Sequence, residues 1–154
     1  MITVRVYGIL IDSQQRVLVS DEYIRGGYFT KFPGGGLELG EGTRDCLKRE
    51  FIEETNLDVT IGEHLYTTDF YQPSAFRSNQ QILSIYYRVH AKEPIALLTK
   101  TVPFDFSPGQ VADPNGAAEV FRWIAWDDFD DTIVNLPIDK IVATMVKVSL
   151  KFEV

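Results

Sequence analysis

Several stretches of the chain are rich in Val, Ile and Tyr and partly alternate with polar residues, as β-strands with one buried face do. We expect strands or short extended pieces at 2–11, 16–20, 28–32, 59–61, 64–71, 81–91 and 119–126. A polar turn at 12–15 separates the first two runs, so they are predicted to pair as a β-hairpin.

Two other stretches have helical features. Residues 43–55 contain no Gly or Pro, and Gly42 and Asn56 flank them. We expect a helix there, with Thr43 as its N-cap and Asn56 in the left-handed conformation that ends many helices. A closing amphipathic helix is predicted after Pro137, where apolar residues recur at helical spacing, although the Val-rich residues 146–148 leave a strand open.

The stretch 99–117 is rich in Pro and Gly and has little periodicity. A loop of that length inside a compact domain is usually functional or mobile, so we treat it as a candidate lid. The chain contains no internal repeat, low-complexity segment or linker that would divide it. A single domain over residues 1–154 is therefore predicted, in agreement with the usual size of one domain.

Charge and cysteine content narrow the possible chemistry. The 22 acidic and 15 basic side chains give a net charge of −7 without any Lys- or Arg-rich run, which argues against long nucleic acid as a partner. Cys46 is the single cysteine, and His64 and His90 are the two histidines. These three residues are too few to form a Cys/His zinc site, so a metal here needs oxygen ligands. No membrane span or secretory leader is recognisable, and we expect a cytoplasmic protein, monomeric or homodimeric.

The predicted helix at 43–55 carries the most informative cluster. At 100° per residue, Glu50, Glu53 and Glu54 share one arc of about 100° on the helix surface. Like charges at this spacing repel, unless a positive charge sits between them. Mg²⁺ supplies that charge, since it prefers carboxylate oxygens and commonly bridges them to substrate phosphates. The plain alternative is an acidic helix face that only contacts solvent.

The glycine run at 34–36, directly upstream, allows tight turning and a close approach of the backbone to a ligand. A backbone carbonyl or N–H of this run is then expected to reach the same cation or a phosphate. Such a run is on its own more often a plain turn than a ligand-binding loop.

Residues 35–57 together resemble the signature of the Nudix hydrolases. The matching positions are Gly35, Glu41, Arg49, Glu50, Glu53 and Glu54, with apolar residues where the family has them. Asn56 departs from the pattern, because the family has Gly there; Asn is the next-best residue for a left-handed helix end, at a cost of about 1 kcal/mol or less. Looser similarity extends to 32–35 and to Glu119.

The resemblance implies an α/β fold, an α/β/α sandwich with a mixed β-sheet, and hydrolysis of a nucleoside diphosphate linked to another group. It also implies Mg²⁺, with Mn²⁺ as a substitute. Position by position, the metal ligands would be the side chains and carbonyl of the following residues: Glu50, Glu53, Glu54 and Gly34. Arg49 would orient the glutamates by ion pairing, and Glu41 would support the loop. The general base is expected at Glu53, with Glu50 and Glu119 as alternatives.

Substrate phosphates are expected to meet Arg25, Lys31 or the backbone of Gly35, although the two basic residues are as often ordinary surface charges. The substrate stays open among nucleoside triphosphates, ADP-ribose, sugar nucleotides and dinucleoside polyphosphates. An alternative function is a catalytically inactive, Nudix-like nucleotide-binding regulatory or interaction module. A third is an acidic scaffold that faces solvent or binds Ca²⁺, although the sequence has no calcium-binding loop of alternating Asp and Asn.

Overall fold

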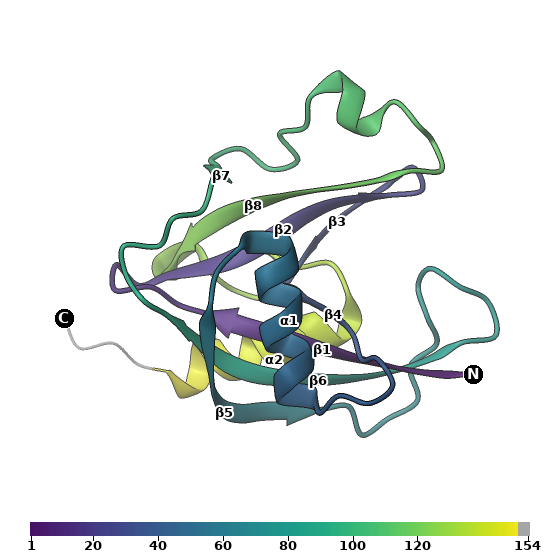
Figure 1. Cartoon of the computed structure of the whole chain (residues 1–154), viewed down its shortest axis with the longest axis horizontal. Helices are drawn as coiled ribbons and strands as arrows, with labels where there is room; N and C mark the ends of the chain where they lie inside the picture. Colours follow the sequence, from purple (N-terminus) through teal and green to yellow (C-terminus); the bar gives the residue numbers. More distant parts are fainter. Residues whose placement is uncertain (151–154) are drawn as a thin grey trace. The chain divides into compact units, whose positions relative to one another are not determined.

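The computed structural model describes residues 1–150 and divides into two compact units. The first unit consists of Met1–Asp12 and Pro33–Leu97, and the second of Ser13–Phe32 and the described chain from Leu98 onward. Each unit has its own sheet (Figure 1). The predicted single domain includes residues 151–154, which lie outside the described residues, and it stays a prediction.

The sheet of the first unit is mixed and four-stranded, in the order β4-β1-β6-β5. Its elements are β1 (Ile2–Leu10), β4 (Gly34–Gly36), β5 (Val59–Thr67) and β6 (Gln81–Ala91), joined by the helix α1 (Thr43–Thr55). β1 pairs in parallel with β6 and antiparallel with β4, while β5 is antiparallel to β6. The predicted strands at 59–61 and 64–71 are joined in the single strand β5, whose register shifts at two irregularities. β5 ends at Thr67, so the prediction of a strand at 68–71 is wrong.

The helix predicted at 43–55 is confirmed as α1. Leu47 and Phe51 are fully buried, and the helix packs against β1, β4 and β5 (Figure 1). Asn56 ends the helix in the left-handed conformation, as expected, and donates its N–H to the carbonyl of Ile52 at 2.9 Å. The prediction of Thr43 as N-cap is wrong: Gly42 holds that position, and the Thr43 hydroxyl lies 2.7 Å from the Tyr87 hydroxyl.

The sheet of the second unit is also mixed, in the order β3-β2-β8-β7. Its elements are β2 (Arg16–Ile24), β3 (Gly27–Lys31), β7 (Thr99–Lys100), β8 (Ala117–Ala125), the short 3-10 helices η1 (Pro108–Val111) and η2 (Trp126–Asp128), and the helix α2 (Pro137–Ser149). β2 is antiparallel to both β3 and β8, and β7 is parallel to β8.

The predicted hairpin between 2–11 and 16–20 is wrong. β1 and β2 belong to different sheets, and β2 forms its hairpin with β3 instead. The polar turn at 12–15 fits a hairpin loop, but strand partners are chosen by burial and hydrogen bonding along the whole strand. Here β2 gains nine paired positions with β8, which lies about a hundred residues further along the chain.

The closing helix is confirmed as α2, so the alternative strand at 146–148 is wrong. Its buried side includes Ile138, Val142 and Val146, spaced four residues apart. The segment 99–117 contains only β7 and η1 as regular structure before β8 begins, and its role as a lid stays a prediction. No helix among residues 1–150 combines the length and the apolar character needed to cross a membrane.

Candidate active site on the glutamate helix

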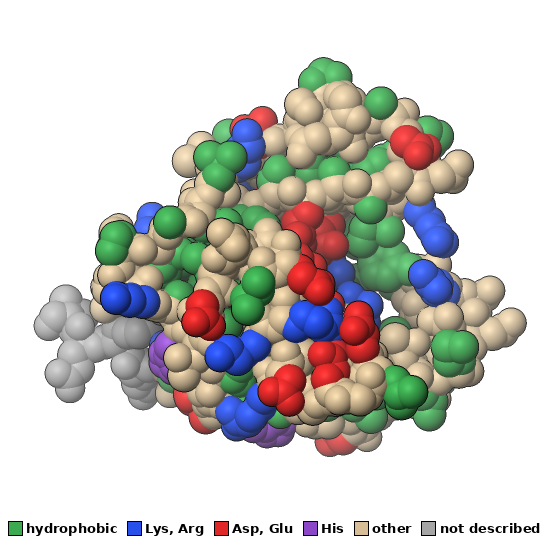
Figure 2. All heavy atoms as spheres, viewed as in Figure 1, with side chains coloured by type: hydrophobic (Ala, Val, Ile, Leu, Met, Phe, Trp, Pro, Cys, Tyr) green, Lys and Arg blue, Asp and Glu red, His purple; other side chains and the backbone are tan. Residues whose placement is uncertain are grey.

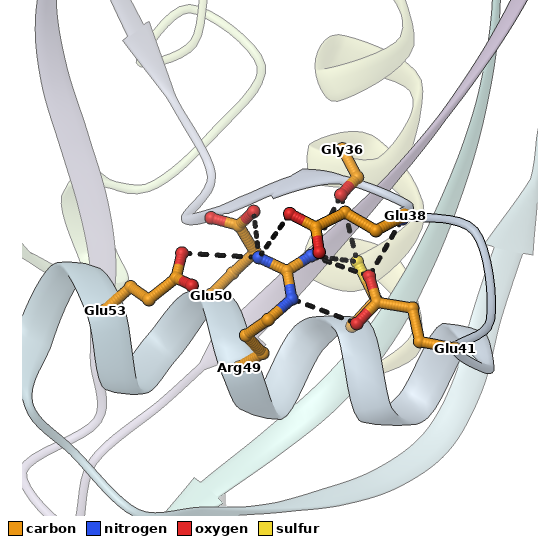
Figure 3. Close-up of polar contacts among 7 residues, drawn as sticks. Gly36, Glu38, Glu41, Arg49, Glu50 and Glu53 are labelled. Carbon is orange, nitrogen blue, oxygen red and sulfur yellow. Dashed lines mark hydrogen bonds and ion pairs between the residues drawn. The ribbon is translucent and has the colours of Figure 1, made fainter.

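Arg49 is the centre of the candidate site (Figure 3). Its Nε and Nη2 donate to the two carboxylate oxygens of Glu41 at 2.9 and 2.6 Å, a bidentate pair. Its Nη1 donates to Glu50 Oε1 at 3.0 Å and to Glu53 Oε2 at 3.2 Å. One guanidinium therefore holds two carboxylates of α1 and one of the preceding loop in fixed relative positions.

The loop before α1 is shaped by its own hydrogen bonds. The Glu38 N–H donates to Glu41 Oε1 at 2.9 Å, and the Glu41 N–H donates to the Glu38 carbonyl at 3.4 Å. The Gly36 carbonyl accepts a hydrogen bond from Arg49 Nη2 at 3.1 Å, which ties β4 to the helix. Glu38 also approaches Arg49 Nη1, at 3.7 Å.

Two glycines of β4 are placed where a side chain would not fit. A Cβ on Gly34 would lie 2.0 Å from the Val6 carbonyl oxygen, and the φ of Gly34 is 153°. A Cβ on Gly35 would lie 2.2 Å from the carboxyl carbon of Glu50. The predicted turn at 34–36 is thus a short strand paired with β1, and its backbone lies directly against the Glu50 carboxylate.

The contacts within this cluster shift several pKa values. Hydrogen bonds from the Arg49 side chain and from the Glu38 backbone lower the pKa of Glu41 to about 2. Hydrogen bonds to Glu41 and Glu50 raise the pKa of Arg49. Burial, followed by the neighbouring Glu41, raises the pKa of the Cys46 thiol to about 12. At neutral pH the cluster therefore holds an anionic Glu41, a cationic Arg49 and a neutral Cys46.

Glu50 and Glu53 differ in exposure. The Glu50 side chain is 13% exposed and the Glu53 side chain 56% exposed, so Glu50 lies deeper in the cluster. Glu54 is half-buried on the same helix. Figure 2 shows carboxylates gathered beside basic side chains on the face that carries α1. Within residues 1–150, no three His, Cys, Asp or Glu side chains are grouped so that they could hold a metal ion as they stand.

The other residues predicted for the site, Glu119, Lys31 and Arg25, lie in the second unit. Glu119 of β8 is directly opposite Glu22 of β2 in the strand register. The buried Ser20 hydroxyl donates to Glu119 Oε2 at 2.5 Å, and Lys31 Nζ lies 3.3 Å from Glu22 Oε2. Lys31 is itself buried, whereas Arg25 is exposed, with a left-handed φ of 47°, at the turn between β2 and β3.

Two acidic residues of these clusters were missed from the sequence, Glu38 and Glu22. Glu22 is two residues from Ser20 on the same strand, and that spacing of two was a signal that both side chains lie on one face. Glu38 had no comparable signal, because the loop conformation that brings it to Arg49 follows no regular period.

Comparisons with known proteins agree with the resemblance of residues 35–57 to the Nudix signature. A model of the NUDIX domain matches residues 1–145. A search of curated proteins found no match. Many solved structures are similar to this chain. The three described below have low sequence identity to it, so their similarity shows a shared fold alone.

The first is the solution structure of the Escherichia coli ORF135 protein, with a TM-score of 0.62 and 16% identity, covering 92% of this chain and 86% of that one. A MutT structure from a study of Aliivibrio salmonicida and Vibrio cholerae has a TM-score of 0.61 and 18% identity, covering 97% of this chain and 100% of that one. A MutT NUDIX hydrolase from Burkholderia pseudomallei has a TM-score of 0.64 and 14% identity, covering 93% of this chain and 96% of that one.

These matches confirm the predicted Nudix-like α/β fold with mixed sheets. Hydrolases of this family generally use divalent metal ions and act on small nucleotides. The chain belongs to the NUDIX domain family and is a Nudix pyrophosphohydrolase, a class of enzyme that acts on nucleoside diphosphate derivatives.

Proposed function

We propose that this protein is a Mg²⁺-dependent hydrolase, with Mn²⁺ as a substitute, that cleaves the pyrophosphate bond of a nucleoside diphosphate linked to another group. Its substrate class is a nucleoside triphosphate, ADP-ribose, a sugar nucleotide or a dinucleoside polyphosphate. The observation that carries the proposal is the position of Glu50 and Glu53, whose carboxylates meet at one nitrogen of Arg49. Two carboxylates of one helix are thereby held next to each other, as cation ligands must be.

The residues fit a hard divalent cation by the chemistry of their donors. Glu50, Glu53 and Glu54 offer carboxylate oxygens and Gly34 offers a carbonyl oxygen, whereas nitrogen and sulfur ligands play no part. The close approach of Gly35 to the Glu50 carboxylate keeps that ligand within reach of the β4 backbone. Glu50 and Glu53 each engage Arg49 through one carboxylate oxygen in this structure, so a cation would share or compete with Arg49 for both side chains.

A divalent cation at this site would lower the pKa of a bound water and offset the charge of the phosphates. The protein's own residues position the ligands and accept the proton of the attacking water. Arg49 keeps the glutamates in position from one side, and the Glu53 carboxylate accepts the proton of the attacking water as the new P–O bond forms and the bridging P–O bond breaks. Glu50 and Glu119 are the other candidates for this proton transfer.

Phosphate oxygens of the substrate are assigned to Arg25, Lys31 and the backbone of Gly35. Lys31 already neutralises Glu22, so the exposed Arg25 has the more available charge of the two basic residues. The cytoplasmic location and the monomeric or homodimeric state also stay predictions.

The role of Glu53 is tested by comparing Glu53→Gln with Glu119→Gln in saturating Mg²⁺. We expect kcat to fall by about 10²-fold or more for Glu53→Gln and by less for Glu119→Gln, since removal of a general base costs about that much. Glu63→Gln, at an exposed position of β5, is the matched control. Normal turnover by Glu53→Gln would refute the assigned role.

The substrate class is tested with a panel of nucleotides and Mg²⁺, scored by product. Release of pyrophosphate indicates a nucleoside triphosphate, and release of a phosphosugar indicates ADP-ribose or a sugar nucleotide. Turnover of none of them, by a protein that binds them, would instead support a regulatory binding module.

A further inference from the structure

The nitrogens of the Arg49 guanidinium have different kinds of partner. Nε and Nη2 are occupied by Glu41 and by the Gly36 carbonyl, none of which is a proposed cation ligand. Nη1 faces three carboxylates, at 3.0 Å for Glu50, 3.2 Å for Glu53 and 3.7 Å for Glu38. Because Nη1 carries only two hydrogens, the three carboxylates compete for it.

This competition has a consequence for cation binding. Glu50 and Glu53 are the two best partners of Nη1 and are also two of the proposed cation ligands. A carboxylate oxygen that ligates a divalent cation is less available to a guanidinium, and the cation and the guanidinium repel each other. The hydrogen bonds of Nη1 to both partners are therefore weakened when Glu50 and Glu53 bind a cation.

We propose that Glu38 is a positioning residue that takes over Arg49 Nη1 when Glu50 and Glu53 bind a divalent cation. This inference rests on the proposed function. Glu38 is the third carboxylate at Nη1, and it is not one of the proposed ligands. Its side chain is 68% exposed and can move, while its backbone is tied to Glu41 by two hydrogen bonds. Glu38 thus keeps Arg49 paired and in place as the ligands change partners.

A second explanation for any effect of Glu38 on cation binding must be separated from this one. A negative charge near the site also attracts a cation directly, without any role of Arg49. The two explanations differ when Arg49 is changed. An effect transmitted through Arg49 disappears with it, whereas direct attraction persists.

The experiment measures Mn²⁺ binding to the full chain by the decrease of the free-ion electron paramagnetic resonance signal. The variants are Glu38→Gln, Arg49→Gln, the double variant and the control Glu63→Gln, which removes an exposed charge from β5. We expect Glu38→Gln to weaken Mn²⁺ binding by about two- to five-fold, as for the loss of one exposed ion pair. In the Arg49→Gln background the same change is expected to have less than about 1.5-fold effect, and Glu63→Gln likewise.

If Arg49→Gln does not fold, Arg49→Lys takes its place in the cycle, because an ammonium lacks the fork needed to hold Glu41 and Glu38 together. The proposal is overturned if Glu38→Gln leaves Mn²⁺ binding unchanged, or if it weakens binding equally with and without Arg49. A wild-type chain that binds no Mn²⁺ would refute the proposed metal-dependent function itself, and this inference with it.

Discussion

At the scale of single residues, neighbouring glycines of β4 have different reasons for lacking a side chain. Gly34 is restricted by the backbone, because its Cβ would meet the Val6 carbonyl and its φ is positive. Gly35 is restricted by the end of a flexible side chain, the Glu50 carboxylate. One glycine therefore serves the fold, while the other leaves room for a candidate ligand.

This difference predicts opposite effects for two matched substitutions. Gly34→Ala should lower the free energy of unfolding by about 2–4 kcal/mol, since backbone strain and a backbone clash cannot relax locally. Gly35→Ala should change it by about 1 kcal/mol or less but weaken Mn²⁺ binding roughly ten-fold, because Glu50 must move. Denaturant titration and Mn²⁺ binding would distinguish them; equal effects on both quantities would contradict this division of roles.

Glu41 gives a pH-dependent prediction. Its pKa is about 2 in the folded protein and 4.5 without these contacts, so the folded state favours the ionised form. The resulting stabilisation is complete above pH 4.5 and is lost as the pH falls towards 2. Glu41→Gln should therefore destabilise the protein more at neutral pH than near pH 2.5, as measured by denaturant unfolding at each pH. A pH-independent difference, or the same trend in Glu63→Gln, would count against it.

At the scale of elements, the second unit is held together at Asp21 of β2, which is completely buried. Arg122 of β8 donates to its carboxylate from Nε at 2.8 Å and from Nη2 at 3.0 Å. Thr30 of β3 donates its hydroxyl at 2.7 Å, and Phe104 donates its N–H at 3.2 Å. One carboxylate therefore connects three strands with the irregular segment 101–116, in which Phe104 has a left-handed φ of 55°.

The substitution Asp21→Asn tests this arrangement. It leaves Arg122 without its charge partner, and the loss of one member of a buried pair costs about 3–5 kcal/mol of unfolding free energy. Hydrogen exchange at the Phe104 amide should also become faster than in the wild type. Asp105→Asn, at an exposed position of the same segment, is the control and should behave like the wild type. Slow exchange at Phe104 in Asp21→Asn would show that other contacts anchor the segment.

At the scale of the whole molecule, a net charge of −7 opposes the binding of a polyphosphate. The carboxylates around Arg49 add to this repulsion locally, since the nearby Glu38, Glu41, Glu50 and Glu53 outnumber the single guanidinium. A divalent cation would reverse the local balance, so substrate binding and cation binding should depend on each other.

We therefore expect activity to disappear in excess chelator and to return with Mg²⁺ or Mn²⁺. At about 100 times its Kd the cation should stabilise the folded protein by ~2.7 kcal/mol, which corresponds to a rise in Tm of roughly 5–10 °C. Thermal unfolding with NaCl of equal ionic strength controls for screening. Full activity in chelator, or the same rise in Tm with NaCl, would contradict a specific cation site.

The sequence by itself determined the features that depend on local spacing. The helix at 43–55, the placement of Leu47 and Phe51 on one side of it, and its left-handed end at Asn56 follow from hydrogen bonds and side-chain spacing between residues three or four apart. The spacing of Arg49, Glu50 and Glu53 on that helix also fixed which charges are neighbours.

Only the tertiary structure decided the features that join distant segments. The separation of β1 and β2 into different sheets, the pairing of β4 with β1, and the position of Glu22 opposite Glu119 all depend on strand register, which local sequence leaves open. The contact of Glu38 with Arg49 depends on the path of an irregular loop. Such contacts require the closure of long segments of chain, and their energy comes from burial and hydrogen bonding that no local pattern encodes.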